Sequence, residues 1–448
     1  MAAEVDKAWR RTVGSRGREA ALVDAATERT WSFEEVESAV AQAVDDLSAS
    51  GIEAGEVLVL AEPNGLVWLS TFLAAQRLGV VVLPLELQLG AERIRKSARS
   101  AGARLLRMAE WEAIGGERRF PPGSCLIKAT SGSTGDPKLY VFKDEEMLAD
   151  GRQVMAGMGL MPEDRNYAVI PFGHSYGLGN LVFPLILEGL CIVCGKGYFP
   201  QEMLEDLVRH EISVFPAVPP LVRALSRSDV LPGLRLKQVI SAGGRLDSRV
   251  RDTFMERFKV PVRNFYGSSE TGGIAFNRRL PQPGDPVSVG EPLPGVCIEL
   301  DVQGGVSVSS AAVYTEGNPL RQGEYGKVEV ADIGHWNDNG ELELTGRRKG
   351  QVKIAGRRIS LAEIEAAVRQ MNGVDDCWIH AFPDRGDELA IACVVAGEAP
   401  VERLRANMRE SLPVWVRPKK CVVVPFLPLN ARGKTCRQQM LALLGLEN

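Results

Sequence analysis

TSGSTGDPK, from Thr130 to Lys138, gathers hydroxyl side chains, two glycines and a terminal lysine into nine residues. Backbone N–H groups, hydroxyls and an ammonium are the groups that bind phosphate oxygens. The segment does not match a P-loop, because Lys138 follows Asp136-Pro137 and no Ser or Thr comes directly after it. We therefore expect a loop that closes over a polyphosphate, with a solvated polar loop as the alternative.

The composition predicts a globular enzyme of two or three domains. The chain has 448 residues, of which 45% are apolar and 25% charged, and a net charge of −4. This charge gives no reason to expect a nucleic-acid partner. The N-terminal segment MAAEVDKAWRRTVGS lacks an apolar signal core, and no apolar stretch reaches membrane-spanning length. We expect a cytoplasmic protein without a membrane span.

Cysteine and histidine spacing gives little support for a metal held by the protein alone. The only CxxC pair is Cys191 and Cys194, and no second pair accompanies it. Structural zinc usually has four suitably spaced ligands, and the four histidines form no HExxH or His-Cys cluster. We expect buried, reduced thiols.

Apolar strand-like runs alternate with helical stretches up to about residue 345, which is typical of α/β proteins. The strand candidates include residues 56–62, 79–86 and 212–218. Residues 33–51 carry apolar side chains at helical spacing and end at Gly51, a suitable cap. We expect a large N-terminal domain of layered sheets and helices over residues 1–348.

The pattern changes near the C-terminus, where a hairpin around Asn339-Gly340 precedes a basic segment. Ser360 and Glu363 form a capping-box pattern before a helix with an apolar face, followed by strand candidates CWIHAF and ELAIACVVAG and the helix VERLRANMRES. Residues 349–448 therefore predict a small α+β domain.

NFYGSSETG, residues 264–272, is the second segment with chemical character. It reads as a strand that runs into a loop, where Tyr266 could stack on a base, Ser269 could bind a phosphate and Glu270 could hold Mg²⁺. Alone, the pattern also fits a turn with a solvated glutamate. Its combination with TSGSTGDPK upstream favours a nucleotide site.

At this point the chain resembles the adenylate-forming (AMP-binding) superfamily, which includes acyl- and aryl-CoA ligases and stand-alone acid-adenylating enzymes. The resemblance spans nearly the whole chain. Beyond the two segments above it rests on TWSFEEV (30–36), LAAQRLGVVVLPLE (73–86), PFGHSYG (171–177), ISAGGRL (240–246), VGEPLPG (289–295), ADIGHW (331–336), GRRKGQVKIAGRRISLAEIE (346–365) and PLNARGKTCR (428–437).

The resemblance implies ATP and Mg²⁺ as cofactors and assigns most of the nucleotide site. Glu270 would hold Mg²⁺, Asp332 would accept hydrogen bonds from both ribose hydroxyls, and Arg347 would support the same sugar. The phosphate loop would comprise Thr130, Ser131, Gly132, Ser133, Thr134, Gly135 and Lys138. The other nucleotide-binding residues would be Gly243, Gly244, Asn264, Phe265 and Tyr266 around adenine, with Gly267, Ser268, Ser269, Lys349 and Lys353.

The same resemblance implies two half-reactions on one site. Lys434 would bridge the substrate carboxylate and the α-phosphate, and the small domain would then rotate about Lys349, which otherwise is one more charge in a basic run. Rotation would bring Ala355 and Gly356 to a channel for the pantetheine thiol of CoA or of an acyl carrier protein. The six basic residues from Arg347 to Arg358 would form a solvated face, or would receive either the phosphates of CoA or an acidic carrier protein. We favour a carrier protein slightly.

The PFGHSYG segment bears on the small-molecule carboxylic acid. Gly173 stands where amino-acid-activating relatives usually have an aspartate, and a buried ammonium without a carboxylate is costly, so an α-amino acid is disfavoured. His174, catalytic near the carboxyl group or else structural, and Tyr176 match the aryl- and acyl-CoA ligase form. Gly243 and Gly267 leave room for an aromatic or an extended acyl group. The sequence does not choose between these two.

Two departures from the family pattern stand out. Val330-Ala331 replaces the usual Thr-Gly before Asp332, and Leu139-Tyr140 follows Lys138 where Gly-Val is common. Neither removes a predicted charged ligand. We expect an ATP-dependent, AMP-forming acid–thiol ligase; the alternatives are an adenylating enzyme with a non-thiol acceptor and a catalytically silent nucleotide-binding protein.

Overall fold

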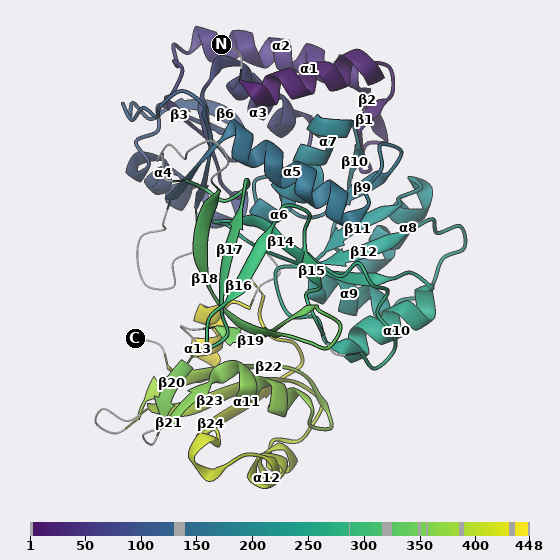
Figure 1. Cartoon of the computed structure of the whole chain (residues 1–448), viewed down its shortest axis with the longest axis vertical. Coiled ribbons are helices and arrows are strands. Elements are labelled where there is room, and N and C mark those ends of the chain that lie inside the picture. Colours follow the sequence, from purple (N-terminus) through teal and green to yellow (C-terminus); the bar gives the residue numbers. More distant parts are fainter. Residues whose placement is uncertain are drawn as a thin grey trace. The chain divides into compact units, whose positions relative to one another are not determined.

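The computed structural model separates into two compact units (Figure 1). The larger unit comprises Met1–Ile298 and Val308–Val328, and the smaller one comprises Glu299–Ser307 and Glu329–Asn448. The structure describes residues 3–129, 139–285, 287–315, 325–347, 351–354, 357–384, 389–429 and 435–446. The sequence predicts a domain boundary after residue 348, next to the expected hinge for rotation of the small domain. This boundary stays a prediction.

The larger unit contains a six-stranded sheet that leads into the predicted phosphate loop. Its strand order is β6-β5-β3-β4-β7-β8. The strands are β3 (Val57–Leu60), β4 (Val81–Pro84), β5 (Leu105–Met108), β6 (Glu110–Ala113), β7 (Ser124–Ala129) and β8 (Leu139–Lys143). β5, β3, β4 and β7 run parallel, whereas β6 and β8 are antiparallel to their neighbours. Thr130 therefore follows the carboxyl end of a parallel strand, where α/β sheets bind ligands.

A nine-stranded sheet carries the other predicted segments of the larger unit. Its order is β15-β14-β13-β12-β11-β9-β10-β1-β2. The strands are β1 (Ala20–Asp24), β2 (Arg29–Ser32), β9 (Arg165–Ala168), β10 (Cys191–Cys194), β11 (Val214–Ala217), β12 (Gln238–Ser241), β13 (Val262–Ser268), β14 (Gly272–Phe276) and β15 (Glu291–Pro292). The run from β1 to β13 is parallel. His174, Gly243 and Glu270 follow the carboxyl ends of β9, β12 and β13, so the topology gathers them at one edge.

Helices accompany both sheets. They are α1 (Glu4–Arg16), α2 (Phe33–Ala49), α3 (Leu66–Leu78), α4 (Ala91–Ser100), α5 (Asp144–Met158), α6 (Ser175–Gly177), α7 (Phe183–Glu188), α8 (Pro200–Arg209), α9 (Pro219–Ser226) and α10 (Ser248–Phe258). α1, α2 and α3 lie side by side (Figure 1). α2 begins at a capping box, in which Ser32 accepts from Glu35 N and the Glu35 carboxylate accepts from Ser32 N. The sequence predicts this helix within two residues at its C-terminal end, where Gly51 has φ of +73°.

A four-stranded sheet follows, with order β16-β17-β18-β19. Its strands are β16 (Cys297–Leu300), β17 (Gly305–Ser310), β18 (Gly326–Trp336) and β19 (Leu342–Arg347). The predicted hairpin around Asn339-Gly340 joins β18 and β19, and Gly340 has φ of +72° in the turn. The chain passes into the smaller unit within β18, between Val328 and Glu329.

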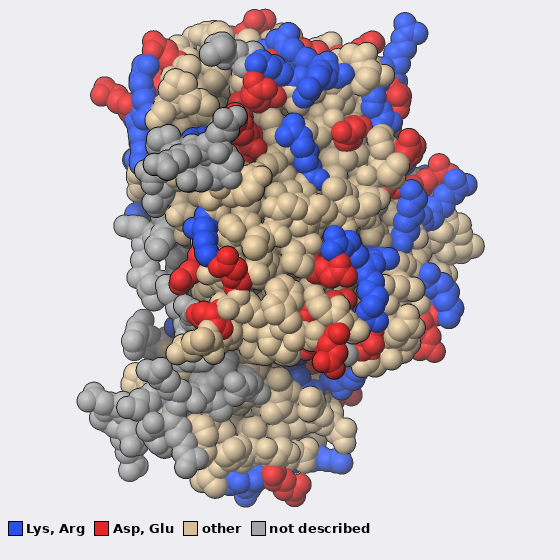
Figure 2. All heavy atoms as spheres, in the orientation of Figure 1, with Lys and Arg blue, Asp and Glu red and all other residues tan. Residues whose placement is uncertain are grey.

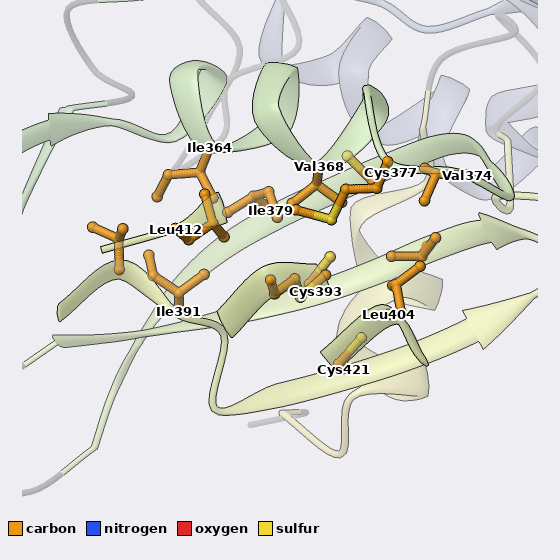
Figure 3. Packing of buried hydrophobic residues seen from close by; sticks show 14 of the residues in the cluster. Ile364, Val368, Val374, Cys377, Ile379, Ile391, Cys393, Leu404, Leu412 and Cys421 are labelled. Atoms are coloured by element: carbon orange, nitrogen blue, oxygen red, sulfur yellow. The ribbon is translucent and has the colours of Figure 1, made fainter. Parts of the chain in front are cut away.

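The smaller unit has its own hydrophobic core and a three-stranded sheet of order β22-β23-β24. In this sheet β22 and β23 are antiparallel, and β23 and β24 are parallel. β20 and β21 form a separate two-stranded ladder. Its elements are β20 (Gln351–Ile354), β21 (Arg357–Ser360), β22 (Val374–Pro383), β23 (Leu389–Gly397), β24 (Lys420–Val424), α11 (Leu361–Arg369), α12 (Val401–Ser411) and α13 (Arg437–Leu443). Ile364 and Val368 of α11 point onto Ile379, Ile391 and neighbouring side chains (Figure 3). The side chains of the Ser360–Glu363 capping-box pattern lie outside the described residues.

The expected fold class is confirmed: a mixed α/β protein with a large N-terminal and a smaller C-terminal part. Cys191 and Cys194 are both buried in β10, and residues three apart in a strand face opposite sides, so they do not form a joint chelating pair. Within the described ranges, no three or more His, Cys, Asp or Glu side chains gather as a metal cage. The same residues include no helix long and apolar enough to cross a bilayer.

Candidate active site

Glu270 lies in the tight turn between β13 and β14, which pair as an antiparallel hairpin. The Ser268 and Thr271 hydroxyl oxygens are 3.0 Å apart across this turn. A Cβ on Gly267 would lie 2.7 Å from the Gly272 carbonyl oxygen. The closeness of the two strands thus gives Gly267 a packing reason to be glycine, besides the predicted space for substrate.

The Glu270 side chain is oriented by a residue from the other sheet. The Tyr140 hydroxyl, on β8, donates a 3.0 Å hydrogen bond to Glu270 Oε1. Tyr314 N donates a 3.2 Å hydrogen bond to the Glu270 carbonyl oxygen. Tyr140 lies two residues after the predicted phosphate loop in sequence and 130 residues before Glu270. This contact therefore links the strand that follows the loop to the turn that carries Glu270.

The predicted phosphate loop, Thr130–Lys138, lies outside the described residues. The strands that precede and follow it in sequence, β7 and β8, are described. Ala129 of β7 and Leu139 of β8 are paired neighbours in an antiparallel ladder. β7 and β8, which flank the predicted loop in sequence, are therefore antiparallel neighbours.

Lys128 on β7, the ladder partner of Tyr140, is a buried ammonium that the sequence analysis did not single out. It is 4% exposed, its Nζ has no hydrogen-bond partner among the described residues, and it lies 4.1 Å from the Phe142 ring centroid. Burial lowers the pKa of Lys128, against the attraction of carboxylates that include Asp150 and Glu270. A lysine inside the apolar strand run CLIKA was the available signal.

Asp150 of α5 forms a hydrogen bond with the β14 strand that follows the Glu270 turn. Its Oδ1 accepts a 2.8 Å hydrogen bond from Gly273 N, and it is 2% exposed. Burial raises the pKa of Asp150, and the Lys128 charge opposes this. A Cβ on Gly272, whose φ is +69°, would lie 2.4 Å from Asp150 Oδ1, so only glycine fits there.

The strand that precedes Glu270 carries the predicted adenine residues Asn264, Phe265 and Tyr266, each 8% exposed. The Asn264 amide is already in use, because Nδ2 donates a 2.8 Å hydrogen bond to the Ser288 carbonyl oxygen. Phe265 packs on Tyr176 with ring centroids 5.8 Å apart. Tyr176 belongs to the predicted acid-binding segment, so the expected adenine and acid residues are neighbours here.

The segment from Pro171 to Gly177 is rigidly placed. His174 caps the short helix α6, with Nδ1 accepting a 3.1 Å hydrogen bond from Tyr176 N. The structural interpretation of His174 therefore has a concrete basis, and its catalytic role stays a prediction. A Cβ on Gly177 would lie 2.0 Å from the Pro171 carbonyl oxygen, which requires glycine.

Gly173 and Tyr176 bear most directly on substrate size. A Cβ on Gly173 would lie 2.7 Å from Pro84 Cβ, so an aspartate there needs movement of β4. The Tyr176 hydroxyl donates a 2.8 Å hydrogen bond to the Ile240 carbonyl oxygen, and burial raises the tyrosine pKa well above its usual range. Gly243, three residues after Ile240, has φ of +81°. At neighbouring Gly244 a Cβ would make only ordinary contact, 3.6 Å from Pro219.

A cavity of about 220 Å³ adjoins this segment, and the sequence analysis did not anticipate it. It is lined on one side by Phe172 and Gly173 and on the other by Trp68, Glu86 and Tyr198. The Tyr198 hydroxyl donates to the Val169 carbonyl oxygen at 3.3 Å. The lining combines two segments quoted above, residues 73–86 and 171–177, with residues outside any motif such as Trp68 and Tyr198.

In the smaller unit, Asp332 and Arg347 are paired neighbours of β18 and β19. Asp332 is 8% exposed, and the preceding Val330 is 6% exposed. The register places the two predicted ribose-binding residues side by side on one ladder; the Arg347 and Lys353 side chains are not among those described. Lys353 lies on β20, opposite Arg358.

Several predicted residues lie outside the described ranges: Lys349, Ala355, Gly356 and Lys434, besides Thr130, Ser131, Gly132, Ser133, Thr134, Gly135 and Lys138. For Lys434 the flanks are described. Leu429 and Thr435 form an antiparallel bridge, and Cys436 N donates a 2.8 Å hydrogen bond to the Pro428 carbonyl oxygen.

Charge on the surface is mixed. On the face shown in Figure 2, acidic and basic side chains are interspersed over the described elements. Such a distribution matches the small net charge of −4.

The donor chemistry around Glu270 fits a divalent ion that arrives with phosphates. Within the described part of the chain Glu270 forms no ion pair, and Tyr140 occupies Oε1 and leaves Oε2. Mg²⁺ is usually bound by one or two carboxylates together with substrate phosphates and water. A single carboxylate oriented by Tyr140 is consistent with that arrangement.

Family models match most of the chain. The AMP-binding enzyme family model matches residues 9–119 and 117–317, and the AMP-binding enzyme C-terminal domain model matches residues 363–434. The chain therefore belongs to the adenylate-forming AMP-binding family.

Individual relatives are distant. Delta-poly-L-ornithine synthetase of Acinetobacter baumannii is 25% identical over 94% of this chain, which spans 35% of that protein. Benzoate–CoA ligase of Thauera aromatica is 26% identical over 71% of this chain and 65% of its own length. The crystal structure of the anthranilate CoA ligase AuaEII with anthranoyl-AMP matches 98% of this chain and 97% of its own, with a TM-score of 0.81 and 19% identity. At that identity the match supports the fold.

Proposed function

We propose that this protein is an AMP-forming acid–thiol ligase that activates an aromatic or a medium- to long-chain carboxylic acid. The observation that carries the proposal is the hydrogen bond from Tyr140 to Glu270. It joins β8, the strand that follows the predicted phosphate loop in sequence, to the predicted metal ligand. Family membership agrees with acid adenylation.

In the first half-reaction a carboxylate oxygen of the acid attacks the α-phosphorus of ATP. The new bond joins that oxygen to phosphorus, and the bond to pyrophosphate breaks. Both reactants are anionic, so catalysis depends on positioning and on fixed positive charge. Lys434 would neutralise the meeting oxygens and the loop from Thr130 would bind the leaving pyrophosphate. Mg²⁺, held by Glu270, would supply further charge neutralisation on the phosphates.

In the second half-reaction a thiol sulfur attacks the acyl carbon of the adenylate. The carbon–oxygen bond to AMP breaks, AMP leaves with the electron pair, and the thiol proton passes to solvent. The thiol would be that of CoA or of a carrier protein's phosphopantetheine, with Ala355 and Gly356 beside its channel and the run of six basic residues near its entrance. The small domain would turn about Lys349 between the steps.

Gly173 supports the exclusion of α-amino acids from the substrate class. It supplies no carboxylate for a substrate ammonium, and Pro84 blocks any side chain there at 2.7 Å. The relatives include a poly-L-ornithine synthetase and a benzoate–CoA ligase, and a glycine at position 173 favours an acid without an ammonium group.

The test is acid-dependent exchange of pyrophosphate into ATP across aromatic and aliphatic acids, with hydroxylamine trapping. Lys434→Ala should reduce exchange about 100- to 1000-fold. Exchange in this variant equal to that of the parent would contradict the role of Lys434. A surface control, Lys237→Ala, should leave exchange unchanged.

The acceptor is then tested with CoA and with phosphopantetheinylated carrier protein. Acyl transfer to either supports the ligase assignment. Adenylate formation without transfer to either thiol would support the second candidate, an adenylating enzyme with a non-thiol acceptor. Tight ATP binding without any adenylate would indicate a silent nucleotide-binding protein.

A further inference from the structure

Two tyrosines hold Glu270 at two different atoms. The Tyr140 hydroxyl donates to side-chain Oε1 at 3.0 Å, and Tyr314 N donates to the main-chain carbonyl oxygen at 3.2 Å. The two aromatic rings meet edge to face, with centroids 4.7 Å apart and an interplanar angle of 70°. Because each tyrosine packs on the other, the side chain and main chain of Glu270 are fixed by one unit.

The Tyr140 ring is further confined by its own strand. Tyr140 is the ladder partner of Lys128, and the Tyr314 ring also lies 6.1 Å from Phe142, two residues along β8. A confined ring holds its hydroxyl oxygen in one place, and a buried tyrosine hydroxyl usually keeps a hydrogen-bond partner. The hydrogen bond to Glu270 is therefore a property of the folded hairpin rather than of a freely rotating side chain.

Tyr140 belongs to one of the two departures from the family pattern noted above. Tyr140 occupies a position where valine is common in the resembling sequences, and valine has no donor. Nothing in the packing of β8 alone requires a hydroxyl, since Phe142 on the same face lacks one. The hydroxyl has a described acceptor in Glu270.

We propose that Tyr140 is a positioning residue that makes Glu270 a one-oxygen ligand and so favours Mg²⁺ over Ca²⁺ in the nucleotide site. This rests on the proposed function, in which Glu270 binds the divalent ion. A carboxylate with one oxygen engaged by a hydroxyl offers the other oxygen alone. Mg²⁺ requires near-ideal octahedral geometry, whereas Ca²⁺ accepts bidentate carboxylates and higher coordination numbers.

Tyr140→Phe removes the hydroxyl and keeps the ring. The readout is Mn²⁺ binding, followed by electron paramagnetic resonance in the presence of α,β-methylene ATP, with Mg²⁺ and Ca²⁺ as competitors. Loss of an outer partner of a metal ligand typically costs about 10- to 100-fold in metal affinity. We expect a loss of that size for Mn²⁺ and Mg²⁺, a smaller loss for Ca²⁺, and unchanged affinity for the metal-free nucleotide.

Tyr167→Phe is the matched control, because its buried hydroxyl also donates to a carboxylate, Asp206 Oδ2, at 2.8 Å. It should leave the Mg²⁺ to Ca²⁺ ratio unchanged. Tyr140→Leu loses the same hydroxyl together with the ring and should show the same shift in that ratio. Combining Tyr140→Phe with Glu270→Gln should add no further loss of metal affinity, since both act through one carboxylate.

Three outcomes would overturn the inference. An unchanged metal preference in both Tyr140 variants contradicts positioning, and a full additive loss in the double variant shows that Tyr140 acts elsewhere. In both cases exchange of pyrophosphate at saturating Mg²⁺ would still support the proposed function. If the parent protein bound no Mn²⁺ with the nucleotide analogue, the metal role of Glu270 would fail and the inference with it.

Discussion

The Tyr176 hydroxyl reaches across the sheet edge and donates a 2.8 Å hydrogen bond to the Ile240 carbonyl oxygen. This bond ties the PFGHSYG segment to the carboxyl end of β12, three residues before Gly243. The predicted acid pocket and the predicted adenine pocket thus share a wall. A change in that wall should affect both stability and substrate binding.

Tyr176→Phe removes this hydrogen bond and keeps the ring on Phe265. We expect the free energy of unfolding to fall by about 1 kcal/mol, the usual net value of one buried hydrogen bond. The KM for the acid should rise while the KM for ATP stays the same. Urea unfolding and steady-state exchange kinetics measure these effects. Equal rises in both KM values would contradict an acid-side position for Tyr176.

Gly173→Asp tests the exclusion of amino acids. The new Cβ would lie 2.7 Å from Pro84 Cβ, and overpacking of this kind costs about 1–3 kcal/mol. We expect a lower melting temperature and no gain of amino-acid-dependent pyrophosphate exchange. Gly173→Ala separates the steric effect from the charge and should show most of the destabilisation. Efficient amino-acid activation by the aspartate variant would show that β4 moves freely.

Lys128→Met tests why a buried ammonium with no hydrogen-bond partner among the described residues is kept two residues before the predicted phosphate loop in sequence. Burial lowers the pKa of this group, so the folded protein disfavours its charged form. Removing such a group relieves a penalty of about 1–3 kcal/mol. We expect the nucleotide-free variant to be at least as stable as the parent and to bind ATP more weakly, measured by denaturation and calorimetry. A large loss of stability would mean that the fold itself needs the charge, through Asp150.

His380 predicts a pH dependence in the smaller unit. Its ring stacks on Trp378 with centroids 5.2 Å apart, and burial, reinforced by Arg437, lowers its pKa from the ordinary 6.5. The unfolded chain then binds a proton more readily than the folded one. The stabilising contribution is complete above pH 6.5 and is lost as the pH falls through the lower folded value.

His380→Asn should therefore reduce the loss of stability between neutral and mildly acidic pH. Denaturant unfolding at several pH values measures this, and a proton NMR titration of the His380 ring gives the folded pKa directly. A His380 pKa at or above 6.5 would contradict the prediction.

Local patterns predicted most of the architecture. Helix α2 follows from its capping box and apolar spacing, and the β18–β19 hairpin follows from Asn339-Gly340, because both depend on residues close in sequence. The confirmed fold class and family follow from ordered motifs. These are features for which neighbouring residues carry the needed information.

Contacts between distant segments could not be predicted in the same way. The Tyr140–Glu270 hydrogen bond joins residues 130 positions apart, and the burial of Lys128 depends on Phe142 and α5 together. Gly267 was expected to leave room for substrate, and the structure adds the close approach of β14 as a reason for glycine. Single-sequence patterns give residue types, whereas these features depend on which strands become neighbours.

The chain passes from the larger unit to the smaller one and back before it enters the smaller unit again, which affects how either unit can be produced alone. The smaller unit needs Glu299–Ser307 as well as Glu329–Asn448, and the larger one resumes at Val308–Val328. A fragment cut at one point, whether by a protease or by gene truncation, leaves one part without a segment of its own sheet. During synthesis the larger unit likewise stays incomplete until Val328 has left the ribosome. Independent expression of the smaller unit would require Glu299–Ser307 to be supplied on a linker.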